Sequence, residues 1–285
     1  MVIVKISGGL GNQLFQYAFG VYIANTLNVV VKYDIQTKLS IRDFTVRNFG
    51  LESLELDIAT QEEINKNRIF SVGFLSRIER KLVLLFPLSN RNYLIERGIH
   101  KFMDYCYLND NCYYDGYWQC LQYASLINKN SLFNTLFFNP NESIINQIQN
   151  LESISIHIRR GDYISIKKNK EIYHICEIDY YTSAIDYISS KCIRPMFFIF
   201  SDDIEWAKKN FSSANYMFVN GNEPLMDLYL MSLCKHNIIA NSTFSWWAAW
   251  FNTYSNKIVT APAKWYKGNL NDNMNEFIPK AWIRL

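Results

Sequence analysis

Short runs rich in β-branched and aromatic residues alternate with helix-like segments through the second half of the chain. These runs occupy residues 153–158, 196–201, 237–241 and 257–261, and apolar residues recur with a helical period between them. Neighbouring parallel strands need a crossover of about a dozen residues, which a helix supplies. The alternation therefore predicts an α/β fold built on a doubly wound parallel sheet.

The N-terminus shows the same order on a smaller scale. Residues 2–6 alternate as a strand does, a glycine-rich turn follows, and residues 14–27 repeat near the helical period before "VVVKYD" resumes strand chemistry. An Asn- and Pro-containing linker at 136–150 separates the two patterns, and 285 residues suffice for two cores. We expect one domain over residues 1–145 and a second over 146–285.

Charge and cysteine content argue against several classes of protein. A formal net charge of +3 is far below the positive field of a dedicated nucleic-acid binder. The six cysteines form no CxxC pair, which favours free thiols in a reducing compartment over a zinc site. No export signal is visible, and no run approaches the roughly 20 apolar residues that span a bilayer. We therefore expect a cytoplasmic protein.

The segment 66–101 carries eight basic side chains against two acidic ones, interleaved with the apolar run "LVLLF". Two interpretations fit this composition. One is a helix that turns its apolar side to the core and its basic side to solvent. The other is a peripheral surface that meets anionic lipid head groups at the inner membrane.

Polar residues gather where the expected strands end. The segments are "GGLGN" at 8–12, "HIRRGD" at 157–162, "SDD" at 201–203 and "NSTFS" at 241–245. Doubly wound sheets bind ligands at the carboxyl ends of their strands, so these segments form the candidate site. "GGLGN" has neither the GxGxxG spacing of a dinucleotide site nor the GK[ST] ending of a P-loop. No HExxH or paired-histidine motif supports a metal.

Arg159 and Arg160 are the strongest candidates for contact with an anion. A guanidinium fork suits a phosphate and keeps its charge. Neighbours on a strand point to opposite faces, so we expect one of the pair to reach the ligand. Asp162 follows in a sharp turn and can hold a guanidinium in place. Exposed arginines that only aid solubility are the plain alternative.

The other polar positions each allow two interpretations. Asp202 and Asp203 diverge on an extended chain, so we expect one to cap the next helix and the other to contact the ligand, rather than a metal-binding pair. Asp227 suits the N-terminal charge of a helix or a ligand contact. Ser242 and Thr243 suit a helix N-cap or a phosphate.

Five motifs in order carry a family resemblance. "GGLGNQLFQYAFG", "GYWQ", "HIRRGDY", "FIFSDDIEW" and "ANSTFSWWAAW" together resemble the bacterial α-1,2-fucosyltransferases of glycosyltransferase family 11, over about residues 3 to 268. The resemblance implies a GT-B fold, in which two Rossmann-like domains face each other across a cleft. Residues 1–145 would form the acceptor-side domain, and residues 146–285 the GDP-sugar-binding domain.

The same resemblance implies an activity. It is the inverting, metal-independent transfer of L-fucose from GDP-β-L-fucose to the 2-hydroxyl of a terminal β-galactosyl acceptor, which forms an α-1,2 linkage. The expected partners are GDP-fucose and a galactoside glycan, with lipid-linked acceptors of lipopolysaccharide or capsule synthesis among the candidates. No cofactor and no metal are expected.

Residue by residue, the resemblance assigns a set of positions to the donor. They are Gly9, Gly11, Asn12, Gln13, His157, Arg159, Arg160, Asp202, Asp227, Ser242, Thr243 and Ser245. Within this set, Arg159 would be the catalytic cation that serves the pyrophosphate, and Asp227 would receive the guanine edge.

Inverting transfer also needs a base near the acceptor hydroxyl, and the motifs do not identify it. Asp34, at the carboxyl end of the second expected strand, is the first candidate, and Asp115 is the second. Tyr117 and Trp118 suit either stacking on an acceptor sugar or a packed core.

Three other functions fit parts of the pattern. Another GDP-sugar-dependent glycosyltransferase would share the donor site. A metal-dependent GT-A transferase would require a divalent cation. A nucleotide-sugar or glycan-binding module would bind without turnover, although the intact HxRRxD residues argue against it.

Overall fold

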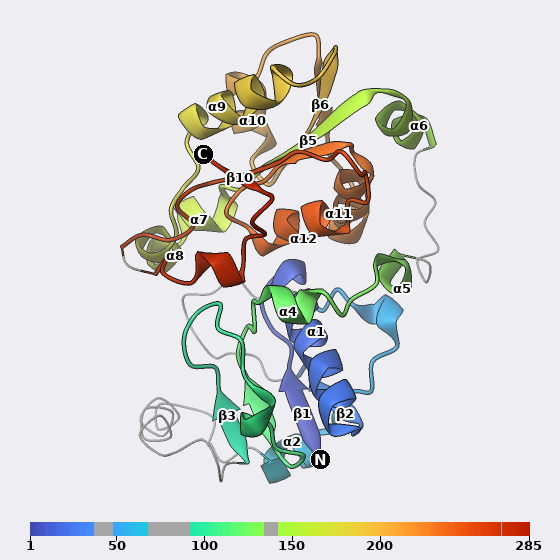
Figure 1. Cartoon of the computed structure of the whole chain (residues 1–285), viewed down its shortest axis with the longest axis vertical. Coiled ribbons are helices and arrows are strands. Elements are labelled where there is room, and N and C mark those ends of the chain that lie inside the picture. Colours follow the sequence, from blue (N-terminus) through green and yellow to red (C-terminus); the bar gives the residue numbers. More distant parts are fainter. Residues whose placement is uncertain (37–47, 68–91, 134–141, 269) are drawn as a thin grey trace. The chain divides into compact units, whose positions relative to one another are not determined.

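The computed structural model describes residues 1–36, 48–67, 92–133, 142–268 and 270–285 (Figure 1). The chain divides into two compact units. Unit 1 comprises Met1–Thr135 with Asn273–Phe277, and unit 2 comprises Leu136–Asp272 with Ile278–Leu285. A short segment near the C-terminus therefore belongs to the first unit, and the chain then returns to the second.

Unit 1 is built on a parallel sheet in the order β2-β1-β4-β3. Its strands are β1 (Val2–Lys5), β2 (Val31–Asp34), β3 (Tyr93–Ile95) and β4 (Tyr113–Asp115). β1 is an inner strand and is buried along its whole length, which explains its apolar run. Because β1 and β4 are parallel neighbours, the segments that follow them lie side by side at the carboxyl edge of the sheet.

One long helix dominates unit 1. α1 (Leu10–Leu27) follows the glycine-rich turn and packs on β1 and β2. The shorter elements are α2 (Gln61–Asn67), α4 (Leu121–Ala124), α5 (Lys129–Phe133) and the 3-10 turns η1 (Glu52–Leu54), η3 (Tyr105–Tyr107) and η4 (Met274–Glu276).

Unit 2 holds a parallel sheet that, within the described ranges, runs in the order β10-β9-β8-β5-β6-β7. Its strands are β5 (Glu152–Ile158), β6 (Pro195–Ser201), β7 (Tyr216–Val219), β8 (His236–Ile238), β9 (Val259–Ala261) and β10 (Ile283–Arg284). Read from β7, the strands come third, second, first, fourth, fifth and sixth along this unit, which is the doubly wound order. The predicted α/β class, with a parallel sheet in each half of the chain, is confirmed.

Helices connect the strands of unit 2. They are α6 (Glu142–Asn150), α7 (Gly161–Ser165), α8 (Lys167–Ile172), α9 (Ile178–Ser189), α10 (Ile204–Asn210), α11 (Pro224–Leu233) and α12 (Thr243–Phe251). Ile154, Ile156 and Ile158 on alternate positions of β5 pack into a core with Tyr181 and Ile188 of α9. The intervening positions of β5 are also buried, as in sheets covered on both faces.

The structure can be compared with the expectations about membrane contact and about the cysteines. The basic segment 66–101 falls largely on residues 68–91, which lie outside the described residues, so its contact with a membrane stays a prediction. Among the helices that the structure does describe, none combines the length and the apolar character needed to cross a bilayer. All six cysteines are free thiols, as expected.

Candidate active site

The middle of the unit 2 sheet brings two of the predicted motifs together. β5 leads into Arg159, and its neighbour β8 leads into the segment that begins α12. Doubly wound folds bind ligands where the connections of neighbouring strands leave toward opposite sides, which in this sheet is between β5 and β8. The strand order therefore places "HIRRGD" and "NSTFS" at the expected ligand position.

Arg159 is held by two carboxylates. Its Nη1 lies 2.7 Å from Oδ2 of Asp202, and its Nη2 donates to Oδ1 of Asp162. The guanidinium also lies over the ring of Tyr163, 5.4 Å from the centroid. Because 20% of its side chain stays exposed, Arg159 is both fixed and accessible, as a group that contacts an anion must be.

Asp202 reaches Arg159 because position 161 is a glycine. A Cβ on Gly161 would lie 2.7 Å from Oδ2 of Asp202, which is closer than real Cβ contacts come. The other oxygen of Asp202 accepts the backbone N–H of Arg160 at 2.8 Å. The carboxylate thus ties the end of β6 to the turn after β5.

Arg160 and Asp203 take the opposite side of this turn. Asp203 caps α10 by accepting the N–H of Trp206 at 3.2 Å, so Asp202 and Asp203 diverge as predicted. The guanidinium of Arg160 stacks over the Trp206 ring at 4.1 Å. Asp203 lies 3.5 Å from its Nε and Glu177 lies 3.9 Å from its Nη1, yet neither nitrogen finds a hydrogen-bond partner in the part of the chain described. Both nitrogens are enclosed by protein, so an anion could reach them only if these side chains moved.

His157 ties β5 to α12. Its Nδ1 lies 2.9 Å from Oγ of Ser245, which itself donates to the carbonyl of Ser242 at 3.3 Å. Burial lowers the pKa of His157 to about 4; the charge of Asp202 opposes this shift and that of Arg159 adds to it. The ring is therefore neutral near pH 7. His157 and Ser245 are buried, so they position α12, and their donor contacts stay predictions.

The start of α12 combines both interpretations of its polar residues. Ser242 is the N-cap and accepts the N–H of Phe244 at 3.3 Å, which confirms the cap. Thr243 begins the helix, and the N–H groups of this first turn can still face a phosphate.

In the first turn of α11, Asp227 accepts from Asn222 at 2.9 Å, and burial raises its pKa to about 6. Its contact with guanine stays a prediction.

The glycine-rich turn of unit 1 joins β1 to α1. Gly9 is the N-cap of α1 with a φ of −74°, and no described atom comes within 4 Å of the position that a Cβ on it would take. Gly11 is buried in the first turn of the helix. Oδ1 of Asn12 accepts from Nε2 of Gln119 at 2.9 Å, which links the turn to the segment after β4.

Gln13 lies in the same turn but is buried. Its Nε2 donates to the carbonyls of Gly8 at 2.9 Å and Asn48 at 2.8 Å, and its Oε1 accepts the N–H of Gly50 at 2.9 Å. These bonds engage both ends of the amide with backbone. Gln13 therefore shapes the loop, and its predicted contact with the donor would require it to release some of them.

The two candidate bases lie in a buried network at the carboxyl edge of the unit 1 sheet. Asp34 accepts from the Tyr113 hydroxyl at 2.6 Å. Asp115 accepts from the Tyr93 hydroxyl at 2.6 Å and pairs with Lys5 at 3.3 Å. Asp34 has no exposed surface, so it could reach an acceptor only if the residues that cover it moved. Access favours Asp115, and both assignments stay predictions.

Tyr117 and Trp118 are neighbours in the segment after β4, but they differ in exposure. Trp118 stacks on Phe19 with ring centroids 4.0 Å apart and is 1% exposed, which supports its interpretation as core. Tyr117 is 39% exposed, so the interpretation as a stacking surface for a sugar remains available to it.

Glu152, Cys192 and His236 offer metal-ligand atoms within 4.8 Å of one another. Glu152 and His236 begin β5 and β8, at the sheet edge opposite the candidate site. Nδ1 of His236 accepts the N–H of Ile258 at 2.9 Å, so in the neutral ring the proton sits on Nε2, which donates to Glu152. A protonated nitrogen does not ligate a metal, and Lys235 pairs with Glu152 at 2.8 Å. These contacts link the starts of β5 and β8 through hydrogen bonds and an ion pair, and they do not form a metal site.

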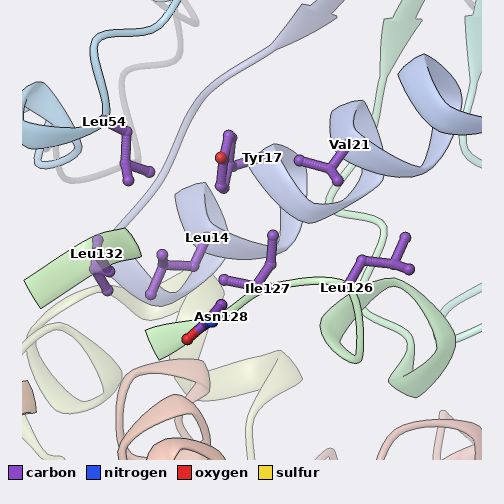
Figure 2. Close-up of a pocket in the computed structure, with 8 residues that line it drawn as sticks. All are labelled: Leu14, Tyr17, Val21, Leu54, Leu126, Ile127, Asn128 and Leu132. Carbon is purple, nitrogen blue, oxygen red and sulfur yellow. The ribbon is translucent and has the colours of Figure 1, made fainter. Parts of the chain in front are cut away.

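A small apolar pocket lies against α1 in unit 1 (Figure 2). It is lined by Leu14, Tyr17, Val21, Leu54, Leu126, Ile127, Asn128 and Leu132. Its volume of about 100 Å³ is below the roughly 300–1,000 Å³ of small-molecule sites. Its lining also comes from helices and loops rather than strand ends, so it is a packing defect beside α1 and not the donor site.

Comparison with known proteins gives full-length matches. The model of the family described as Glycosyl transferase family 11 matches residues 1–285. O-antigen biosynthesis glycosyltransferase WbnK of Escherichia coli is 34% identical over an alignment of 310 positions, which covers 98% of this chain and 99% of the relative. Alpha-1,2-colitosyltransferase of Escherichia coli is 33% identical, over 100% of this chain and 99% of the relative.

More distant proteins match in part. Galactoside 2-alpha-L-fucosyltransferase SEC1 of Bos taurus is 29% identical over 102 residues, which are 34% of this chain and 28% of the relative. The solved structure of fucosyltransferase NodZ from Bradyrhizobium covers 87% of this chain and 91% of its own, with a TM-score of 0.46 and 13% identity.

Proposed function

The chain belongs to glycosyltransferase family 11, and from this premise we propose that it transfers L-fucose from GDP-β-L-fucose to the 2-hydroxyl of a terminal β-galactosyl acceptor. We propose that the transfer inverts the anomeric centre and needs no metal. Arg159, in the turn after β5, carries the proposal, because it is fixed by two carboxylates and stays partly exposed. Preorganised cations of this kind stabilise a departing diphosphate.

In the proposed reaction, the acceptor oxygen bonds to the anomeric carbon of fucose from the face opposite GDP. The bond from that carbon to the diphosphate oxygen breaks, and its electron pair leaves with GDP. Arg159, Arg160 and the N-terminus of α12 would stabilise the new charge. The proton of the acceptor hydroxyl would pass to a carboxylate of unit 1, for which Asp115 and Asp34 are the candidates.

Transfer of colitose is the second candidate. The relative named alpha-1,2-colitosyltransferase is 33% identical over the whole chain, so family membership alone does not choose between the donors. Colitose is L-fucose without its 3-hydroxyl, and one diphosphate site would serve both GDP-sugars. A site built to hydrogen-bond a hydroxyl discriminates strongly against the analogue that lacks it. Competition between equal concentrations of GDP-fucose and GDP-colitose would show which donor is consumed.

The proposed acceptor class has support from the name of one relative. The name of the O-antigen biosynthesis relative supports a lipid-linked glycan as the physiological acceptor. Such an acceptor would bring the enzyme to the inner membrane surface, where the basic segment 66–101 could meet lipid head groups. We propose this acceptor with a terminal β-galactose as the substrate class.

A donor and acceptor screen tests the function directly. The full-length chain is incubated with GDP-fucose and a panel of free and lipid-linked galactosides, and the product is examined by linkage analysis. The proposal predicts an α-1,2-fucosylated galactose and one GDP released per product. A different linkage, or turnover with GDP-colitose but not GDP-fucose, would contradict it.

A further inference from the structure

Glu96, one residue past β3, binds the turn that follows β4. Its Oε2 accepts the N–H of Tyr117 at 2.7 Å, and its Oε1 accepts the N–H of Trp118 at 3.1 Å. Its own N–H donates to the carbonyl of Asp115 at 3.0 Å. One side chain therefore fixes two consecutive amides of the turn to the neighbouring strand.

The backbone of this turn depends on close contact with Glu96. A Cβ on Gly116 would lie 2.4 Å from Cβ of Glu96 and 2.9 Å from its Oε2, so only glycine fits. Trp118 has a φ of 55°, a conformation that residues with a side chain seldom adopt. Such a conformation persists where the surroundings hold it. The bonds from Glu96 and the stack of Trp118 on Phe19 do so here.

The turn also contacts α1 and the glycine-rich loop that precedes this helix. Nε2 of Gln16 donates to the carbonyl of Gly116 at 2.9 Å. The Tyr117 ring lies beside Gly8, where an added Cβ would come within 3.5 Å of it. With 39% of Tyr117 exposed, the turn presents an aromatic surface at the carboxyl edge of the unit 1 sheet. The apolar face of a galactose ring is suited to such a surface.

We propose that Glu96 is a positioning residue for the acceptor, because it holds the 116–118 turn so that Tyr117 packs against the galactoside beside the glycine-rich loop. This inference rests on the proposed function. Its test is the acceptor, since the bonds from Glu96 reach only the 116–118 turn and β4, and involve neither the donor residues of unit 2 nor the candidate donor residues of the glycine-rich loop.

Glu96 also titrates in the working range of an enzyme. Burial raises its pKa to about 7; the two backbone bonds oppose the shift, and the charge of Asp115 adds to it. The charge of Glu96 in turn raises the pKa of Cys120 and Tyr123 beyond the turn, while Lys5 pairs with Asp115. Above pH 7 the carboxylate offers an acceptor oxygen to each N–H. Below pH 7 one oxygen becomes a hydroxyl, and one of the two N–H groups loses its acceptor.

The variant Glu96→Gln keeps the size of the side chain and removes one acceptor oxygen. We expect the KM for the galactoside to rise about tenfold, the cost of one hydrogen bond to a charged group, and the KM for GDP-fucose to stay within about twofold. In the wild type, kcat/KM for the acceptor should fall as the pH drops below about 7. In Glu96→Gln, kcat/KM for the acceptor should be low at every pH and should show no further fall below about pH 7.

Two further variants separate a positioning role from a loss of fold. Glu205→Gln on α10, whose side chain is 81% exposed, is the matched control and should leave both KM values and the pH profile unchanged. Tyr117→Ala should raise the acceptor KM by itself. If Glu96 acts through Tyr117, adding Glu96→Gln to Tyr117→Ala should raise the acceptor KM by less than a further factor of about two.

Backbone amide exchange gives a readout that does not depend on turnover. The protection factors of the Tyr117 and Trp118 amides should fall in Glu96→Gln, and in the wild type below pH 7. Unchanged protection, an equal rise in both KM values, or a persisting acid limb in Glu96→Gln would overturn the inference. A folded wild-type chain that transfers no fucose would instead overturn the proposed function, and amide exchange would still decide whether Glu96 holds the turn.

Discussion

Arg159 and Arg160 occupy one turn but differ in what they leave available. Arg159 is bound by Asp162 and Asp202, which fix its position and offset its charge. Arg160 is stacked on Trp206, and two of its nitrogens are enclosed without a hydrogen-bond partner among the described residues. The acids near the pair mean that the site does not attract a diphosphate by net charge alone. Directed N–H groups in fixed positions have to supply the specificity.

Replacing Arg159 tests this at the residue scale. Arg159→Ala should keep the fold and lower kcat/KM for GDP-fucose by roughly a hundred- to a thousandfold, the usual cost of removing a preorganised donor at a developing charge. Steady-state kinetics and circular dichroism measure the two effects. Lys208→Ala on the exposed surface of α10 is the control for loss of a cation. Near-normal turnover of Arg159→Ala would contradict the assigned role.

Gly9 offers a second test, because a side chain there has room. A Cβ would meet no described atom within 4 Å, and a φ of −74° is ordinary for alanine. Gly9→Ala should therefore fold, with a melting temperature lowered only by the loss of a favoured N-cap residue. If the donor approaches this backbone, the KM for GDP-fucose should rise at least about tenfold through misplacement of the substrate. A variant with unchanged kinetics would remove Gly9 from the donor site.

Sequence motifs identify residues by type and position but not by burial. The pattern found Arg159 and the diverging Asp202 and Asp203, because strand ends and helix caps leave local signals. It also selected Asp34 as a base, although long-range packing buries that side chain completely. Glu96 lies outside every motif, and its partners come from a turn about twenty residues later in the chain, a separation that local periodicity does not report.

At the scale of elements, the turn between β5 and α7 determines the geometry of the site. Gly161 begins α7 and lets the carboxylate at the end of β6 reach Arg159. The sequence predicts β5 and β6 because isoleucine recurs at every second position of β5 and β6 is a nearly continuous apolar run. β3 and β10 cover three and two residues, too few for a periodic signal.

Gly161→Ala should disturb this turn without unfolding it. The added Cβ would lie 2.7 Å from Oδ2 of Asp202, so the carboxylate must move and Arg159 loses a restraint. We expect kcat/KM for GDP-fucose to fall at least about tenfold while the far-UV spectrum stays unchanged. In an Asp202→Ala background the carboxylate that would clash is absent. There Gly161→Ala should lower kcat/KM for GDP-fucose by less than about twofold. Additive losses in the two variants would contradict this explanation.

At the scale of the whole molecule, composition and alternation predicted two parallel sheets, and the structure has them. They could not predict that 273–277 belongs to unit 1. Phe277 stacks on His100 with centroids 4.1 Å apart and lies 5.7 Å from Phe15, so side chains remote in sequence decide where this segment packs. Contacts of this kind carry no local pattern.

A metal-independent reaction is a prediction for the intact enzyme. Because guanidinium and backbone N–H groups would stabilise the leaving diphosphate, EDTA should change kcat/KM by less than about twofold, and added Mg²⁺ should not raise it further. Initial rates with and without chelator measure this. Loss of activity in EDTA with recovery on Mg²⁺ would favour the metal-dependent alternative.

The most direct test of the central claim is a crystal structure of the full-length protein with GDP. We predict the diphosphate at the carboxyl ends of β5 and β8, with its oxygens within hydrogen-bond distance of Arg159 or Arg160 and of the first turn of α12, and with no bound cation. A diphosphate elsewhere on the molecule, or one chelated by a divalent metal, would contradict it.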